Sequence, residues 1–368
     1  MRIAASPRLA AAALVAATVL SCTDAPDPAG PDATPLAQAA TKRGPTLTPQ
    51  ASGTTARLIG VDAVNQNVAW VSGTGGTFAV TTDGGATWHP GVVAGAESLQ
   101  FRDVEGVSAT EAYLLSIGPG TDSRIYHTTD GGESWSLQFQ NADPNAFYDC
   151  FAFWTPNRGF AFSDGVDGRF PVIRTTDGET WEDIGDNIPA AQPGEASFAA
   201  SGTCTAAQGG KRGWFGTGGV GDARIFATTD GGETWTAYPT PIVQGAPEGA
   251  SGIFTIDFRD PHRGILAGGD LVRETEVLPN VARTSDGGAT WELATPFPFG
   301  NVFGLSYVNK SGLPAVFAVA RAGVAWSPDE GDTWNELPGY LDYWAVSFAN
   351  QNAGWMVGGE GRIVKISF

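Results

Sequence analysis

Positive charge is scarce in this chain of 368 residues, which has 21 lysine and arginine residues against 39 aspartate and glutamate residues. The net charge of −18 excludes nucleic acid as the expected partner, because phosphate contacts need a basic face that this composition supplies only locally. Charged residues of both signs make up 16% of the chain, which is too few for a disordered polyelectrolyte. We therefore expect a globular protein that does not bind nucleic acid.

Cysteine and histidine are also rare, with three residues of each type. Neither set has the spacing of a zinc site or of a CxxC redox motif, and the sequence contains no HExxH, GxSxG or P-loop motif. These absences remove the usual signals of metal, hydrolase-triad and nucleotide chemistry. The sequence thus assigns no metal ligand, no cofactor and no catalytic residue.

The apolar run near the N-terminus, positions 10–20, has 11 residues and is too short to span a bilayer. It follows the basic residues Arg2 and Arg8 and ends in small residues. This order is typical of a signal peptide, which we expect at residues 1–21.

The four residues Val19-Leu20-Ser21-Cys22 resemble a bacterial lipobox, in which Cys22 receives the lipid and becomes the first residue of the mature protein. The alternative is a simple secretory signal that is cleaved nearby. Residues 22–44 are rich in proline, alanine and threonine without hydrophobic periodicity, so we expect a disordered tether there and a folded domain at 45–368. The expected location is the bacterial cell envelope, on its periplasmic or outer-membrane face, with the protein exported and lipid-anchored.

Glycine and tryptophan, in contrast, are abundant, with 50 and 12 residues. Glycine is at about twice its usual share and has no collagen period, which indicates many tight turns and therefore many short strands. With 42% hydrophobic and 11% aromatic residues the chain can bury a large core. This composition favours an all-β protein over a helix bundle.

Half of the tryptophans occupy the same place in a repeated motif of the type TTDGGxTW. Six copies are present, and their tryptophans lie 43 to 56 residues apart, a regularity that chance does not produce. The aspartate and tryptophan residues of the six copies are Asp83 and Trp88, Asp130 and Trp135, Asp177 and Trp181, Asp230 and Trp235, Asp286 and Trp291, and Asp329 and Trp334.

Each copy predicts a β-hairpin, because a β-branched run enters a glycine-rich turn and Thr-Trp begins the strand that leaves it. The aspartate can accept hydrogen bonds from the turn, and the tryptophan can cover the hairpin. These residues resemble the Asp-box of sialidases and other β-propellers. In the third copy Asp177 and Trp181 are one residue closer than elsewhere, which predicts a tighter turn.

The stretch before each box repeats as well, and a seventh copy at 354–366 has no box after it. The sequence therefore predicts an all-β, seven-bladed β-propeller of four-stranded blades, six with Asp-box hairpins, closed by an N-terminal strand at 45–50. The order and spacing of these units resemble the photosystem II assembly and stability factor family of seven-bladed propellers and its non-photosynthetic bacterial relatives. That resemblance implies a chaperone-like scaffold, and it is more specific for fold than for function.

The box aspartates are expected to be structural, because they are spread around one rim and cannot converge as a carboxylate pair does in glycoside hydrolysis. A sialidase needs an arginine cluster, a tyrosine nucleophile with a glutamate partner, and an Arg-Ile-Pro segment, to which the nearest match is Arg169-Phe170-Pro171. Enzymatic use of Asp103, Asp149 or Asp164 is an open alternative that no spacing argument supports.

Cys150 and Cys204 each lie nine residues before the glycine that opens the second strand of a blade. We therefore expect them at equivalent places on the innermost strands of adjacent blades, where they could form a disulfide. The alternative is two small residues that fill a narrow central channel. The sequence leaves both interpretations open.

Four arginines follow an acidic residue by two positions in the loop between the second and third strands of a blade: Arg124, Arg169, Arg224 and Arg362. In a propeller this loop lies on the face opposite the Asp-box turns. There the four would form a positive ring able to bind carboxylates, or each would pair with its own loop acid at the surface.

Together these features predict a lipid-anchored, extracytoplasmic propeller that acts without catalysis as a binding or assembly scaffold. The expected partner is another envelope or secreted protein, with membrane contact through the lipid anchor only and a monomeric state. The alternative is a sialidase-like glycoside hydrolase or a carbohydrate-binding propeller. The two functions differ in whether arginine, tyrosine and acidic groups converge at the channel mouth.

Overall fold

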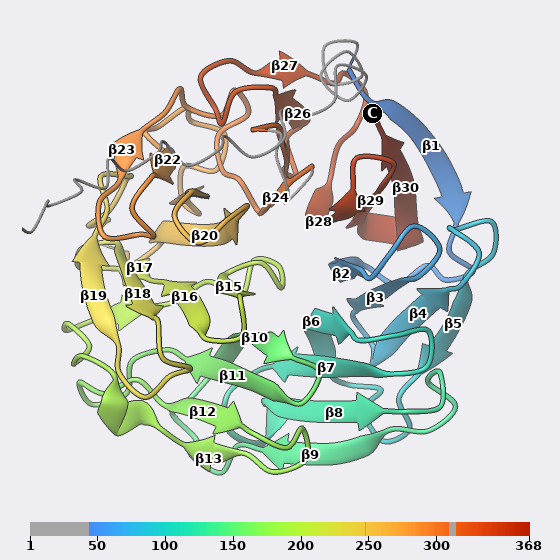
Figure 1. Cartoon of the computed structure of the whole chain (residues 1–368), viewed down its shortest axis with the longest axis horizontal. Coiled ribbons are helices and arrows are strands. Elements are labelled where there is room, and N and C mark those ends of the chain that lie inside the picture. The colour runs from blue at the N-terminus through green and yellow to red at the C-terminus, as the bar shows by residue number, and fades with distance from the viewer. Residues whose placement is uncertain (1–43, 247, 309–313) are drawn as a thin grey trace, which may run out of the picture. The chain divides into compact units, whose positions relative to one another are not determined.

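The computed structural model describes residues 44–246, 248–308 and 314–368. The predicted signal peptide, Cys22 and all but the last residue of the predicted tether lie outside the described residues. The described residues form seven antiparallel sheets placed in a ring around a central channel (Figure 1). Within them, helical structure is limited to single 3-10 turns, and no helix has the length and hydropathy to cross a membrane.

Every sheet contributes a four-stranded blade, as predicted from the repeat. From the inside outward, the first three blades are β2 (Leu58–Ala63), β3 (Ala69–Gly73), β4 (Thr77–Thr81) and β5 (His89–Val92); β6 (Gln100–Gly106), β7 (Ala112–Ile117), β8 (Arg124–Thr128) and β9 (Ser136–Gln140); and β10 (Tyr148–Thr155), β11 (Arg158–Ser163), β12 (Val172–Thr175) and β13 (Glu182–Asp183).

The remaining blades follow the same order. They are β15 (Thr205–Gln208), β16 (Arg212–Gly216), β18 (Arg224–Thr228) and β19 (Thr236–Pro239); β20 (Ser251–Phe258), β21 (Gly264–Asp270), β22 (Val281–Thr284) and β23 (Glu292–Leu293); β24 (Gly304–Tyr307), β25 (Val316–Val319), β26 (Val324–Ser327) and β27 (Asn335–Glu336); and β28 (Tyr343–Asn350), β29 (Ala353–Gly358), β30 (Arg362–Ser367) and β1 (Thr46–Ala51).

The N-terminal strand β1 closes the ring, as the sequence predicted. It pairs with β30 from Thr46 opposite Ser367 to Ala51 opposite Arg362, and the two strands lie side by side in Figure 1. Gln50 then joins this last blade to the first one: its side-chain oxygen accepts hydrogen bonds from the indole N–H groups of Trp88 and Trp355, each at 3.1 Å. Seven four-stranded blades therefore close without an open sheet edge at the join.

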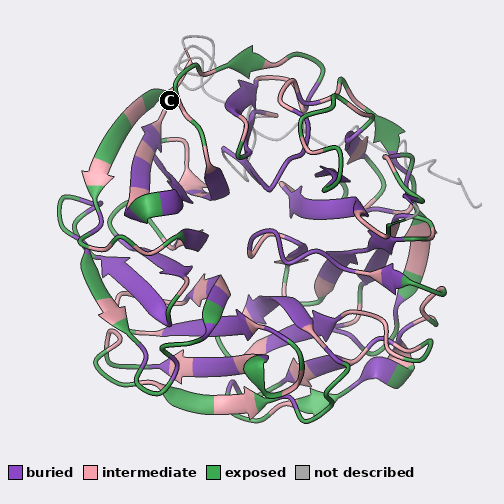
Figure 2. Cartoon of the chain, turned by 180° about the vertical axis from the view of Figure 1, so that it is seen from behind, coloured by how far each residue is buried: buried purple, intermediate pink, exposed green. Residues whose placement is uncertain are grey.

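Burial decreases from the channel outward (Figure 2). The inner strands are buried on both faces because each blade packs against its two neighbours, whereas the outermost strands are largely exposed. Proline in three of these outer strands, Pro49, Pro90 and Pro239, removes a backbone donor from an exposed edge and so disfavours pairing with another chain.

Antiparallel pairing gives the ring two different faces. The Asp-box face carries the box turns and the turns between first and second strands, and the loop face carries the loops between second and third strands and the connections between blades. One connection on the loop face has an unpredicted addition: β14 (Glu195–Ala196) and β17 (Gly218–Gly219) extend the fifth blade into a six-stranded sheet. This addition positions the segment from which the candidate site is built.

Candidate functional site

The Asp-box carboxylates are fully engaged inside their own hairpins. Asp83 Oδ1 accepts hydrogen bonds from Thr87 N and Thr81 Oγ1, both at 2.9 Å, and Asp83 Oδ2 accepts one from Thr87 Oγ1 at 2.6 Å. The hydroxyl and backbone donors of Thr87 lower the pKa of Asp83 to about 2, and Ser134 does the same for Asp130. The same bonds recur at the other four boxes: Asp177, Asp230, Asp286 and Asp329.

The third box has the shorter turn that its sequence predicts. Asp177 bonds the residue three positions ahead, Thr180, whereas the other boxes bond the residue four positions ahead. The box tryptophans pack across the junctions between blades, for example Trp135, whose ring centroid lies 5.1 Å from that of Phe78. The boxes thus fix their own hairpins and attach neighbouring blades to each other.

The four predicted loop arginines occupy equivalent places, at or just before the start of a third strand, on the loop face. Arg169 binds Asp183 and Asp186 at 2.7 and 2.8 Å, and Arg362 binds Asp342 at 2.9 Å. Arg124 donates to the carbonyl oxygen of Thr121 at 2.6 Å. The acid two positions earlier is within ion-pair distance only for Arg362, whose Glu360 lies 3.9 Å away among the described residues.

Arg224 forms an ion pair with Glu195, whose side chain is completely buried. The guanidinium binds both carboxylate oxygens of Glu195, and the carboxylate also accepts hydrogen bonds from Thr217 Oγ1 at 2.6 Å and Gln192 N at 2.8 Å. A buried carboxylate is tolerated only when it is paired and hydrogen-bonded in this way. The pair fixes the chain at β14, directly before the segment described next.

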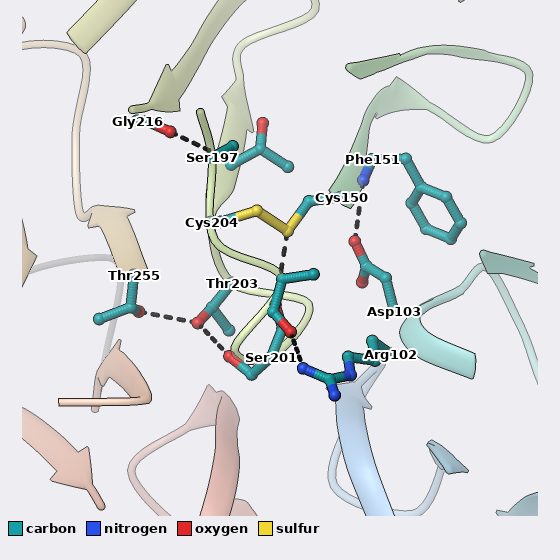
Figure 3. Close-up of a disulfide and its surroundings, with 12 residues drawn as sticks. Arg102, Asp103, Cys150, Phe151, Ser197, Ser201, Thr203, Cys204, Gly216 and Thr255 are labelled. Atoms are coloured by element: carbon teal, nitrogen blue, oxygen red, sulfur yellow. Dashed lines mark hydrogen bonds between the residues drawn. A yellow bond between two sulfur atoms is a disulfide. The ribbon is translucent and has the colours of Figure 1, made fainter. Parts of the chain in front are cut away.

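Residues 197–204, which we call the plug, run from β14 to β15 across the loop-face end of the central channel. Figure 3 shows Ser197, Ser201, Thr203 and Cys204 of this segment. Ser201 Oγ donates to the carbonyl oxygen of Phe303 in blade 6 at 2.7 Å, and Thr203 Oγ1 donates to Thr255 Oγ1 in blade 5 at 2.8 Å. On the opposite side, Arg102 of blade 2 donates to the carbonyl oxygen of Ala199. The plug therefore contacts blades on several sides of the ring.

The two cysteines meet at the end of the plug. Cys204 is joined to Cys150 of β10 by a disulfide, with a distance of 6.1 Å between the two Cα atoms, so they lie on adjacent blades as expected from their positions. Cys150 Sγ lies 3.4 Å from the carbonyl oxygen of Ser201 (Figure 3). Both side chains are completely buried.

On the Asp-box side of the plug, the channel encloses a cavity of about 190 Å³ that is lined by the innermost strands of all seven blades. Its acidic residues are Asp62, Asp103, Glu105 and Asp257. In the part of the chain that the structure describes, no group of three or more His, Cys, Asp and Glu residues is placed to hold a metal ion.

A larger pocket of about 480 Å³, the mouth pocket, lies on the loop-face side of the plug. The plug supplies Ser197, Phe198, Ala199 and Ala200 to its wall, and the other blades supply side chains of mixed character: Arg102, Ile117, Phe147, Asp149, Asp164, Leu271, Glu274, Phe303, Arg321 and Trp344. None of the four arginines chosen from the sequence is among these residues.

Three other arginines surround Trp344 at this mouth. The guanidinium carbons of Arg57, Arg102 and Arg321 lie 5.4, 5.9 and 5.7 Å from the indole ring centre. At such distances the ring attracts the cations, and it also keeps them around one flat aromatic surface. The indole N–H donates to Asp342 Oδ1 at 3.1 Å, which fixes the ring orientation.

Two carboxyl groups of the pocket lining, the buried Asp149 and the half-buried Asp164, support the plug. Burial raises the pKa of Asp164 to about 6, although Ser197 N donates to its Oδ1 at 2.7 Å. Burial, and then the neighbouring Asp164, raise the pKa of Asp149, which accepts a hydrogen bond from the backbone of Ala199. Both acids also line the mouth pocket, and each accepts a hydrogen bond from the backbone of the plug, Asp164 from Ser197 and Asp149 from Ala199.

The long loop of blade 5, which contributes Leu271 and Glu274 to the mouth pocket, carries several exposed apolar side chains. In the long loop of blade 5, Leu271, Val272 and Val277 have exposed fractions of 45, 62 and 57%. The loop is fixed at its base, where Arg273 binds Asp270 at 2.7 Å and Asn301 Oδ1 accepts a hydrogen bond from Asp270 N at 2.8 Å. Exposed aliphatic side chains on an ordered loop are typical of a contact surface.

Comparison with known proteins supports the fold at this point. Residues 49–165 match the family model described as photosynthesis system II assembly factor YCF48. No curated protein matches the chain. The solved structure titled "YCF48 bound to D1 peptide" is 16% identical with a TM-score of 0.60, over 88% of this chain and 97% of that one.

Two further solved structures have the same fold. YCF48 from Cyanidioschyzon merolae is 17% identical with a TM-score of 0.58, over 87% of this chain and 98% of that one. The Niastella koreensis GH74 enzyme is 16% identical with a TM-score of 0.59, over 87% of this chain but 53% of the enzyme. The chain is an Asp-box β-propeller, and the predicted resemblance to the photosystem II assembly factor is confirmed.

Sequence reasoning missed the residues that converge at the mouth. Arg57, Arg102 and Trp344 are large residues at the beginning of innermost strands, where a narrow channel favours small ones, and this contrast was the available signal. The plug had a weaker signal, the unusual length of the connection between β13 and β15.

Proposed function

We propose that the protein is a non-catalytic scaffold that binds a segment of another protein at the mouth pocket on the loop face. The observation that carries the proposal is the pocket itself. There the indole of Trp344 is surrounded by three arginines and lies near exposed aliphatic side chains. Tryptophan and arginine dominate the binding energy of many protein interfaces, and the fixed plug and loop limit the ordering cost of binding.

The chemistry of the lining fits a polypeptide better than a sugar. Arg321 of the lining, which pairs with Glu274 at 3.1 Å, and the exposed Arg57 beside Trp344 can donate to the carbonyl or carboxylate oxygens of a bound segment. Phe198, Leu271 and Phe303 of the lining offer apolar contacts to its side chains. A related propeller, YCF48, has been solved with a D1 peptide, which supports the binding of protein segments by this fold.

The proposal includes export and lipid attachment at Cys22, which rest on the sequence of residues 1–22. It also includes a monomeric protein whose contact with the membrane is through the lipid alone. An envelope or secreted protein is then the partner that shares its compartment.

A glycoside hydrolase is the second candidate, because the GH74 enzyme has a similar fold and the channel cavity contains carboxylates. In that case Asp103 or Asp257 would serve as acid or base on the Asp-box side of the plug. Hydrolysis of sialosides or polysaccharides by the purified protein, lost on Asp103→Asn, would support this candidate and contradict the scaffold proposal.

The scaffold proposal is tested by selecting peptides from a random library on the purified protein and measuring their affinity by fluorescence polarisation. We expect Trp344→Ala and Arg321→Ala to weaken binding by at least about tenfold. The matched control is Arg283→Ala on the Asp-box side, which removes an ion pair with Asp332 at 2.7 Å, as Arg321→Ala removes the ion pair with Glu274 at 3.1 Å. Selected peptides that bind Trp344→Ala normally, or that lose affinity on Arg283→Ala instead, would refute the proposal.

A further inference from the structure

The position of the plug determines whether the channel cavity and the mouth pocket are separate from each other. It supplies four of the pocket's lining residues on one side, and the channel cavity begins on its other side. Gly202 lies against Asp103 so closely that a side chain there would collide with the carboxylate. The plug in its present position is therefore both the inner wall of the mouth pocket and the closure of the channel.

The plug is anchored strongly at its two ends. At its N-terminal end the buried ion pair of Glu195 and Arg224 fixes β14 to blade 4. At its C-terminal end the disulfide fixes Cys204 to blade 3. The segment between the anchors belongs to no strand or helix and carries one large apolar side chain, Phe198, which packs against Phe254 with 4.7 Å between ring centroids.

Between the anchors the plug is held by separate hydrogen bonds to several blades and not by a strand ladder of the kind that stabilises the blades. The partners are Arg102, Asp164, Gly216, Thr255, Ile256 and Phe303. Phe198 and Ala200 also pack in the core between the blades, but a segment outside the strand ladders opens more readily than the strands themselves. A covalent bond at one end reduces the number of open conformations available to such a segment.

We propose that oxidation of Cys150 and Cys204 is the step that completes the mouth pocket. The inference rests on the proposed function, since it concerns the regulation of that same site. In the reduced protein the seven blades still form without the disulfide. The plug then leaves its position often enough that the channel opens and the pocket loses one wall.

The reaction is a thiol–disulfide exchange. The two cysteine thiols lose two protons and two electrons as the S–S bond forms, and an oxidant of the disulfide class accepts them, its own S–S bond breaking to leave a dithiol. Because both cysteines are completely buried once the plug is seated, the exchange occurs while the plug is open, and the product is then protected from reductants. The bond acts as a lasting lock that is set after export to an oxidising compartment.

The test compares the oxidised protein with Cys150→Ser/Cys204→Ser in two measurements that need no partner. Hydrogen exchange with mass spectrometry reads the backbone of residues 197–204. Fluorine NMR of protein labelled with 5-fluorotryptophan reads the pocket through the Trp344 resonance, which is assigned by its loss in Trp344→Phe.

We expect the serine pair to exchange at least about tenfold faster in the plug and to shift or broaden the Trp344 resonance, with the box tryptophan resonances unchanged. The matched control is Gln50→Ala, which weakens ring closure between the last and first blades without touching the plug. If the serine pair does not fold, wild-type protein unfolded, reduced and refolded with and without reoxidation gives the same comparison.

Plug exchange in the serine pair equal to that of the oxidised protein would overturn the inference, and so would an equal loss of plug protection in Gln50→Ala. The selected peptide provides a further readout, with an affinity for the serine pair at least about tenfold lower than for the oxidised protein and restored in the wild type on reoxidation. A wild-type protein that binds no selected peptide refutes the proposed function, while the exchange and fluorine results decide the present inference by themselves.

Discussion

At Asp164, burial and hydrogen bonding act in opposite directions on one carboxyl group. Burial is the larger effect and raises its pKa to about 6, whereas the hydrogen bond from Ser197 N favours the ionised form. Asp149 faces the same region and has a raised pKa for the same reason, and Arg102 lies close enough to favour ionisation of Asp149. Ionisation of Asp149 and Asp164, which support the mouth pocket, thus costs folding free energy at neutral pH.

This cost predicts the pH dependence of stability. The folded protein holds the Asp164 proton up to about pH 6, and the unfolded chain releases it near 3.8, so the contribution of this residue is favourable at low pH and is lost as the pH rises through 6. Asp164→Asn keeps the acceptor for Ser197 and removes the titration. Between pH 4 and 7.5 the variant should gain about 2 kcal/mol of unfolding free energy relative to wild type, measured by urea denaturation. If the difference in unfolding free energy between the variant and the wild type were the same at pH 4 and pH 7.5, the raised pKa assigned to Asp164 would be contradicted.

At the scale of the strand, β1 determines closure of the ring. Gln50 is the contact that links this strand to both the last and the first blade, through Trp355, Trp88 and the carbonyl oxygen of Gly84. The strand is otherwise mostly exposed, so its attachment depends on the β30 ladder, on Leu47, which packs against the core, and on Gln50.

Gln50→Ala should lower the unfolding free energy by about 1–3 kcal/mol, because two indole N–H groups lose their partner, whereas the carbonyl oxygen of Gly84 keeps Lys365. Urea denaturation measures the change. The control is Gln138→Ala on β9, the outer strand of another blade, where the amide binds only Ser136 and little change is expected. Equal effects of the two substitutions would show that Gln50 has no special part in closure.

The hairpins and the plug differ in how far the sequence could predict them. All the hydrogen bonds that define a box join residues within four positions, so the motif contains the information for its own fold. The plug is held by contacts such as Arg102 with Ala199 and Ser201 with Phe303, which are 97 and 102 positions apart. No periodicity in the sequence predicts such contacts, because they form only once the ring has closed.

At the scale of the whole molecule, the two faces of the propeller have different roles. The Asp-box face is occupied by internally bonded hairpins, which account for the six box aspartates as parts of the fold. The loop face carries the plug, the mouth pocket and the exposed aliphatic side chains of blade 5. The four arginines chosen from the sequence lie on this same loop face but outside the mouth pocket, where they bind nearby groups, because the sequence does not indicate which loops converge at the axis.

The most direct measurement of this account is photo-crosslinking of a selected peptide that carries a photoreactive phenylalanine, with the linked residues identified by mass spectrometry. The account predicts links to the mouth of the loop face, at Leu271, Glu274, Arg321 and Trp344, and their loss in Trp344→Ala. Links to the Asp-box hairpins, or to the channel residues beyond the plug at 205–207 and 256–258, would contradict it.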